Sequence, residues 1–130
     1  MWYEFVSNKQ CLERLYREIP DLCDVRIESL DIDREGTRLT IAFDMPKYVD
    51  FPPQKWHPEY NTAFVELSLS GIESLKIKYS RVFLKSSVSV EKVSDGFLCV
   101  NIRGGVTAEI CVDSVHISKV SGYFKCLDKS

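Results

Sequence analysis

Alternating apolar and polar residues run through most of this chain, which is the pattern of strands that bury one face. Five stretches show it most clearly, namely residues 39–43, 63–69, 75–79, 98–102 and 106–112. Further strands are predicted around residues 25–32, 88–90 and 115–117. We therefore predict about eight strands.

Turn signals separate the strands. Gly104-Gly105 and Asp95-Gly96 are two-residue hairpin signals, and Arg34-Glu35-Gly36 resembles a three-residue hairpin loop whose glycine takes the left-handed conformation. The apolar parity changes within residues 25–32, which predicts a β-bulge near Glu28–Ser29. Because short strands joined by tight turns lie antiparallel, we expect an antiparallel sheet.

One helix is predicted before the strands. Ser7 and Gln10 have the spacing of a capping box, and Pro20 ends the helical pattern. Between them lies one apolar face, made of Cys11, Leu12, Leu15, Tyr16 and Ile19. Such a narrow face packs on something larger. We predict one α+β domain over residues 1–130: a mostly antiparallel β-sheet, strongly curved or sandwich-like, with one N-terminal helix packed on it.

The stretch from Asp44 to Tyr60 (DMPKYVDFPPQKWHPEY) interrupts the strand pattern. It holds four of the five prolines, which favours a stiff, extended connection. Its aromatic residues, including Tyr48 and Trp56, are too apolar for a fully solvated loop, and we expect them to fold back onto a sheet and close one end of the core. Loops of this length are often functional. The sequence leaves two interpretations of this stretch, a structural lid over the core and a binding loop.

The charge is distributed unevenly. The net charge of −2 gives no support for general nucleic-acid binding, but acids gather in residues 21–35 and bases in residues 76–92. Asp31 and Asp33 are expected to face outward from their strand, with Glu35 at the adjacent turn. This acidic strand edge would speed the encounter with a basic partner. It would equally discourage edge-to-edge aggregation.

The five cysteines are odd in number and include no C-x-x-C pair, which does not fit a secreted disulfide scaffold. The first residues, MWYEFVSNKQ, have no basic start and no apolar run, so no signal peptide is predicted. No stretch is long and apolar enough to cross a membrane. We expect a cytoplasmic protein with reduced and mostly packed thiols.

Residues suited to catalysis are few. His57 lies near Asp50 and Glu59, which suggests a general base. A second hypothesis is a carboxylate pair formed by Asp44 and Asp50 with Glu59. His116 alternates with apolar neighbours and should point away from the core. No spacing resembles a zinc site or a phosphate-binding loop. We predict no catalytic, cofactor or metal site. A small enzyme and a small-ligand-binding β-domain, each built on residues 44–60, remain the alternatives.

Several landmarks together resemble immunity protein family 50 of the bacterial polymorphic toxin systems. They are an amino-terminal aromatic segment, a helix ending in Glu18-Ile19-Pro20-Asp21-Leu22, a hairpin with Gly36, the run Phe51-Pro52-Pro53-Gln54-Lys55-Trp56, and a strand-rich remainder. The resemblance covers nearly the whole chain and includes no catalytic motif.

The resemblance implies a small, cytoplasmic, non-enzymatic protein that binds and neutralises the carboxy-terminal domain of a cognate toxin. Such toxins are delivered between neighbouring bacteria, as in contact-dependent growth inhibition. A nuclease is a natural candidate, because its cleft must be basic to hold phosphates. The expected contact residues are Asp31, Asp33, Glu35, Trp56 and His57. Direct binding of nucleic acid or of a membrane is not expected.

Overall fold

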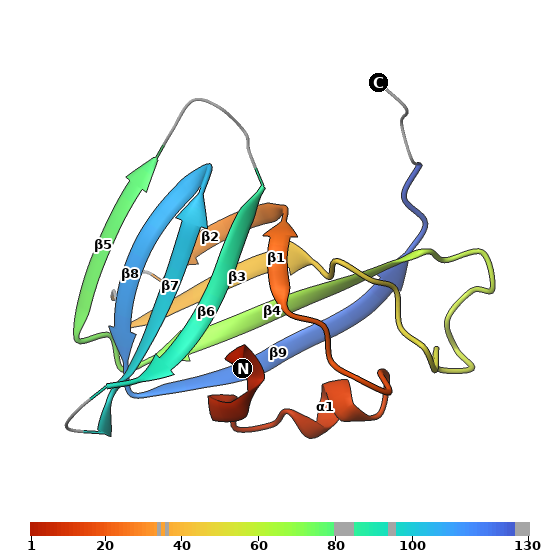
Figure 1. The fold of residues 1–130 in the computed structure, drawn as a ribbon, viewed down its shortest axis with the longest axis horizontal. Coiled ribbons are helices and arrows are strands. Elements are labelled where there is room, and N and C mark those ends of the chain that lie inside the picture. Colours follow the sequence, from red (N-terminus) through yellow and green to blue (C-terminus); the bar gives the residue numbers. More distant parts are fainter. Residues whose placement is uncertain (34, 36, 80–84, 94–95, 127–130) are drawn as a thin grey trace.

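The computed structural model describes residues 1–33, 35, 37–79, 85–93 and 96–126. These residues form nine strands in two antiparallel sheets, and neither sheet closes into a barrel (Figure 1). The four-stranded sheet has the order β2-β3-β4-β9, with bounds Ile27–Ile32, Arg38–Asp44, Thr62–Ser70 and Ser114–Tyr123. The five-stranded sheet has the order β1-β6-β7-β8-β5, with bounds Leu22–Val25, Ser86–Lys92, Leu98–Gly104, Val106–Val112 and Ser74–Tyr79. The predicted antiparallel β-structure is confirmed.

The core lies between the two sheets, whose strands run across one another (Figure 1). Alternate residues of β3 and β4, such as Phe43 and Val65, are fully buried, as are Val100 of β7 and Ile110 of β8. Each such side chain stabilises the fold by about 1.5–3 kcal/mol when it leaves water. The arrangement leaves one outer face on each sheet.

The strand predicted at residues 25–32 is divided between the sheets. β1 ends at Val25 and pairs with β6, whereas β2 begins at Ile27 and pairs with β3. The predicted bulge is confirmed, because the register of β2 against β3 shifts between Ile27 and Ser29. The change of apolar parity therefore marks a bulge beside a corner where the chain changes sheet.

The N-terminal helix is much shorter than predicted. In the described part of the chain it is reduced to a 3₁₀ turn, η1 (Trp2–Phe5), and one α-helical turn, α1 (Gln10–Glu13). The predicted capping box is wrong, because the Ser7 hydroxyl donates to the Val115 carbonyl oxygen of β9 instead (3.3 Å). The α+β description is thus corrected: the domain is mostly β, with two short turns beside it.

Tertiary contacts explain why the helix ends early. The backbone N–H groups of Asp50 and Phe51 both donate to the Leu15 carbonyl oxygen, at 2.8 and 3.0 Å. The Tyr16 hydroxyl donates to the Lys47 carbonyl oxygen (2.5 Å). The predicted apolar face still packs, with four of its residues buried, namely Leu12, Leu15, Tyr16 and Ile19. The proline stretch has therefore replaced the helical hydrogen bonds, which tertiary context readily does when helix propensity is weak.

Residues 6–8, the N-terminal strap, cover the free edge of β9. Val6 forms a parallel bridge with Val115. The Asn8 side chain then takes the place of a strand residue: its Oδ1 accepts from the Ile117 N–H (2.7 Å) and its Nδ2 donates to the Ile117 carbonyl oxygen (2.8 Å). The backbone groups of Val115 and Ile117 at the edge of β9 are thus hydrogen-bonded without another strand.

The turn predictions can be checked in part. Gly104-Gly105 joins β7 to β8, as predicted. Gly96 has a positive φ of 79° between β6 and β7, whereas Asp95, Arg34 and Gly36 lie outside the described residues. No helix among the described residues is long and apolar enough to span a membrane.

The prediction of mostly packed thiols is wrong. Cys11, Cys23 and Cys126 are exposed, Cys111 is half-buried, and Cys99 alone of the five is buried. All five thiols are free. The apolar pattern predicted that Cys11 would lie on the buried face of the helix. In the short helix α1, Leu12 is buried instead and Cys11 is exposed.

Candidate functional site

The five residues predicted to contact a partner lie at opposite ends of the four-stranded sheet. Asp31, Asp33 and Glu35 belong to the hairpin that joins β2 to β3, and Trp56 and His57 follow the far end of β3. The seven residues of β3 separate the two groups by roughly 20 Å. The fold therefore does not bring these residues together as one site.

At the loop end, residues 45–60 form a lid over the core. Trp56 lies so close to β9 that a Cβ on Gly122 would meet the indole Cε3 at 2.6 Å. The Tyr48 ring lies 6.1 Å from the Trp56 ring, and both pack against the core. Met45 and Val49 are buried beneath them. The aromatic residues thus fold back onto a sheet, as predicted, and close one end of the core.

His57 is held by local contacts. Its Nδ1 accepts from the backbone N–H of Glu59 (3.1 Å), and its ring lies 5.8 Å from that of Tyr60. Asp50 instead accepts from the Arg17 N–H (3.0 Å) and pairs with Lys47 (3.2 Å). The backbone hydrogen bond from Arg17, then the Lys47 ammonium, hold the pKa of Asp50 below its ordinary value. No contact within the described residues joins His57 to a carboxylate, so the general-base alternative gains no support.

Asp44 has a structural position at the same end of the sheet. Its buried carboxylate accepts from the Tyr123 hydroxyl (2.7 Å) and from the Lys125 ammonium (3.0 Å). Burial raises the pKa of Tyr123, and the neighbouring Asp44 raises it further. Asp44 Oδ1 has no hydrogen-bond partner among the described residues. The side chain ties β3 to the end of β9 and does not join Asp50 and Glu59 in a carboxylate pair.

At the hairpin end the acids are open to solvent. Asp31 is exposed on β2, opposite Thr40 of β3. The Asp33 carboxylate caps the turn, because it accepts from the Thr37 N–H (2.9 Å), the Thr37 hydroxyl (3.2 Å) and the Arg38 N–H (3.3 Å). Glu35 is exposed in the turn itself. Two of the three acids thus face solvent freely, and Asp33 fixes the shape of the turn that carries them.

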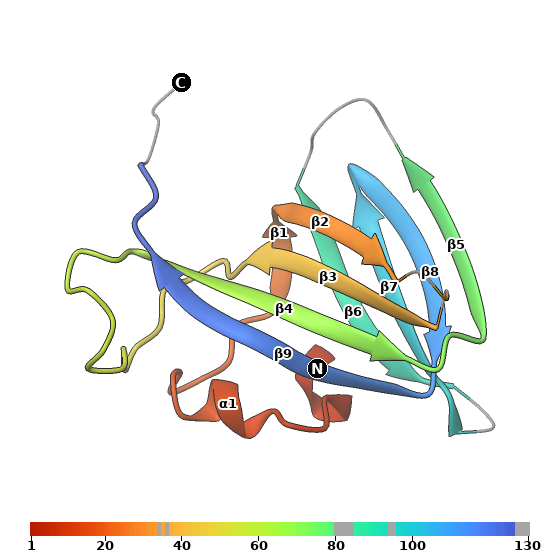
Figure 2. The same ribbon diagram turned by 180° about the vertical axis from the view of Figure 1, so that it is seen from behind.

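The strand register extends this acidic end into a row across the sheet. Asp31, Thr40, Ser68 and His116 occupy neighbouring positions on β2, β3, β4 and β9. Neighbouring strands lie about 4.8 Å apart, so the row spans about 15 Å. His116 faces outward between Val115 and Ile117, both buried, as its alternation predicted. No helix in the described part of the chain covers this outer face (Figure 2).

Charged residues border the row. Glu66 lies on β4 two positions from Ser68, on the same outer face, and is half-buried. Lys119 is its neighbour on β9, but the Lys119 ammonium lies over the Phe64 ring, 6.0 Å from its centre. Glu66 and Asp31 make no ion pair with any described residue. The outer face of the four-stranded sheet therefore carries a row of polar side chains bordered by Phe64 and Lys119, together with the acids Asp31 and Glu66, which make no ion pair with a described residue.

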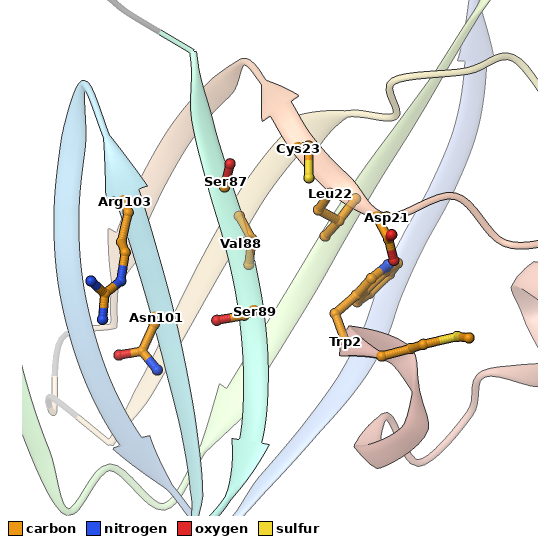
Figure 3. A pocket seen from close by; sticks show the side chains of 10 residues that line it. Trp2, Asp21, Leu22, Cys23, Ser87, Val88, Ser89, Asn101 and Arg103 are labelled. Carbon is orange, nitrogen blue, oxygen red and sulfur yellow. The ribbon is translucent and has the colours of Figure 1, made fainter.

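The outer face of the five-stranded sheet has a different character. A hollow of about 280 Å³ lies over β1, β6 and β7, where Ser89 and Asn101 are paired neighbours and Arg103 follows on the same side (Figure 3). A second hollow of about 330 Å³ is bordered by Arg103, Lys76 and Lys78. These three cations make no ion pair with any described residue. Neither of these two hollows is lined by Trp56, so they give no support to the small-ligand-binding alternative built on that residue.

Sequence reasoning missed Thr40, Ser68, His116 and Glu66 as members of one surface. Their alternation placed each on an outer face, but only the register of β2, β3, β4 and β9 brings them into neighbouring positions. No local signal in the sequence gives that register, because residues paired here are separated by up to about half the chain.

Comparison with known proteins identifies the family of this chain. Neither a curated protein nor a solved structure matches it. The model of a family described as immunity protein 50 matches residues 8–123, which is most of the chain and includes both sheets. The chain therefore belongs to the immunity protein 50 family.

Proposed function

We propose that this protein binds a cognate toxin domain and neutralises it, so that the cell that makes the toxin is protected. Membership of the immunity protein 50 family carries this proposal. The proposed action is non-enzymatic binding in the cytoplasm. The family membership also supports the non-enzymatic part of this proposal.

The outer face of the four-stranded sheet is the surface that suits a protein partner best. No helix among the described residues covers it, and it carries the exposed Asp31 and the half-buried Thr40, Glu66 and His116 on paired strands. A standard interface buries about 800 Å² on each partner, so the β2–β3 hairpin with Glu35 would take part beside the row from Asp31 to His116. Trp56 and His57 lie outside this proposed surface, and their contact with a partner stays a prediction.

The acids on this face favour a basic partner surface. Asp31, Glu35 and Glu66 are exposed or half-buried, and no described residue forms an ion pair with them. A nuclease toxin presents a basic cleft to hold phosphates, and an acidic face can occlude it. We therefore propose a nuclease as the class of toxin, with nucleic acid and this protein competing for one cleft.

Growth rescue tests the proposed function directly. The carboxy-terminal domain of the large protein encoded immediately upstream is expressed in a bacterial host, with and without this chain. We expect the domain alone to stop growth and co-expression to restore it. If the domain kills regardless of this chain, the proposal is wrong.

Titration of the purified proteins separates binding from catalysis. A stoichiometric inhibitor abolishes toxin activity at an equal molar amount, whereas an enzyme that modifies the toxin acts well below that ratio. We expect an endpoint at one chain per toxin domain and co-elution of the two on gel filtration. Complete inhibition at a small fraction of the toxin concentration would instead favour the enzyme alternative.

A further inference from the structure

Two cysteines that lie twelve positions apart in the sequence become direct neighbours on the five-stranded sheet. Cys99 of β7 pairs with Cys111 of β8 across the hairpin that turns at Gly104-Gly105. Glu109 lies on β8 two positions before Cys111, and therefore on the same outer face. The Sγ atoms of both cysteines and a carboxylate oxygen of Glu109 all lie within 4.8 Å of one another. Among the described residues, this is a cluster of three metal-ligand side chains on adjacent rigid strands.

The geometry is close to that of a tetrahedral zinc site. With Zn–S bonds of about 2.3 Å and a Zn–O bond of about 2.1 Å, ligand atoms are separated by about 3.5–3.8 Å. The present separations are at most 4.8 Å and so exceed this by no more than about 1.3 Å, a distance on the scale of a side-chain rotation. Cys99 is buried, Cys111 is half-buried and Glu109 is exposed. The cluster thus has a closed side on the sheet and an open side toward solvent.

The neighbours on the adjoining strands also suit a cation. Glu91 of β6 lies opposite Cys99, and Ser74 of β5 lies opposite Cys111. Lys76 of β5 lies opposite Glu109 but makes no ion pair with it. The Cys99 thiol donates to the Asn101 side-chain oxygen (3.7 Å).

We propose that Cys99, Cys111 and Glu109 form a binding site for a zinc ion, with a fourth coordination position open to water. Two thiolates and one carboxylate form a ligand set that zinc accepts, and zinc displaces thiol protons when it binds. This site lies on the other sheet from the proposed toxin-binding face and does not depend on the proposed function.

Cobalt titration tests the site, because thiolate ligands give bound Co²⁺ a strong charge-transfer absorption in the near ultraviolet. The full-length protein is reduced with a phosphine, which avoids thiol chelators, and titrated with Co²⁺. We expect one Co²⁺ per chain and full displacement by Zn²⁺. Cys111→Ser should abolish the absorption, and Glu109→Gln should weaken binding at least about tenfold. Cys23→Ser, a matched exposed cysteine on β1, should leave it unchanged.

A stability measurement guards against loss of folding in the variants. Zn²⁺ should raise the melting temperature of the wild type and of Cys23→Ser but not that of Cys111→Ser, whose fold is verified by circular dichroism. An absorption that persists in Cys111→Ser would overturn the proposal. So would an equal zinc effect on all three proteins, or a failure to bind Co²⁺ by protein whose thiols are shown by mass spectrometry to be fully reduced.

Discussion

The two ends of the four-stranded sheet present contrasting surfaces. At the loop end, Trp56 packs on Gly122, and Asp44 is buried beneath contacts from β9 and the residues that follow it. At the hairpin end, Asp31 and Glu35 are exposed, and Ile32 retains 48% of its surface to solvent. One end is closed by the protein itself, and the other is open.

The contrast shows that the most unusual stretch of the sequence is a structural part of the fold, whereas the open surface is formed by ordinary residues. The sequence leaves a structural lid and a binding loop as alternatives for residues 44–60. In the structure Met45 and Val49 are buried, and Tyr48 and Trp56 pack against the core, as in a lid. The acids of the hairpin, which are less conspicuous, lie on the open face. Mutations should therefore affect stability at one end and partner binding at the other.

The largest effect is expected at the lid. Trp56→Ala removes the indole from Gly122 and should lower the free energy of unfolding by about 3 kcal/mol, measured by chemical denaturation. The adjacent exposed residue, His57, serves as the control. His57→Ala should change the free energy of unfolding by less than about 0.5 kcal/mol. Equal losses in both variants would contradict the distinction between a packed Trp56 and a solvated His57.

Charge reversal on the open face should come next. Asp31→Lys with Glu66→Lys should weaken toxin binding about 30-fold, or about 2 kcal/mol, measured by calorimetry, with little change in stability. The matched control is Glu18→Lys with Asp21→Lys, two exposed acids that precede β1. If the control weakens binding as much as the test pair, net charge rather than this face governs the interaction.

A smaller effect is expected at the turn cap. Asp33→Ala leaves the Thr37 and Arg38 N–H groups without their acceptor and should cost about 1 kcal/mol of stability. Asp33→Asn keeps a side-chain oxygen and should recover most of this loss in the same denaturation experiment. A loss in Asp33→Asn as large as in Asp33→Ala would show that charge, not acceptance of hydrogen bonds, is what matters.

The smallest effect is a pH dependence at the lid. The pKa of Asp50 is lowered in the folded protein, first by the hydrogen bond from the Arg17 N–H and then by Lys47. The charged Asp50 carboxylate therefore stabilises the fold at pH values above the ordinary carboxyl pKa, and this stabilisation is lost as the pH falls through the lowered pKa. Asp50→Asn should lower the melting temperature at pH near 7, and the difference should disappear as the pH falls through the lowered pKa of Asp50. A difference that stays constant over this range would exclude the charge of Asp50 as its cause.

The strands and their alternation were predictable, whereas the helix and the corner were not. The alternation in residues 63–69 correctly identified the inward-facing residues of β4, because a half-buried strand shows its buried face in the local sequence. The helix was overestimated because the Leu15 carbonyl oxygen accepts from Asp50 and Phe51, a contact no local window contains. The change of sheet at Arg26 depends on which strands β1 and β2 meet, and the sequence pattern does not specify partners.

The proposed surface was predictable only in part. Asp31, Asp33 and Glu35 were expected at a strand edge and a turn, and the structure has them there. His116 and Glu66 were recognisable as outward-facing, yet their neighbours follow from a register set by long-range pairing. Cys99 and Cys111 could not be recognised as a pair from the sequence, because their contact also depends on strand register. The spacing patterns of known metal sites mostly place ligands closer together in the chain.

The strap that covers β9 ties the timing of folding to the synthesis of β9. Asn8 is synthesised 109 positions before Ile117, to which it is hydrogen-bonded. At about 5–20 residues per second, the strap waits roughly 5–20 s before it can meet β9. Until β9 has been made, both the strap and the outer edge of β4 therefore lack the strand that they contact. For a protein proposed to guard its own cell, protection then rests on completed copies already present, not on those still being made.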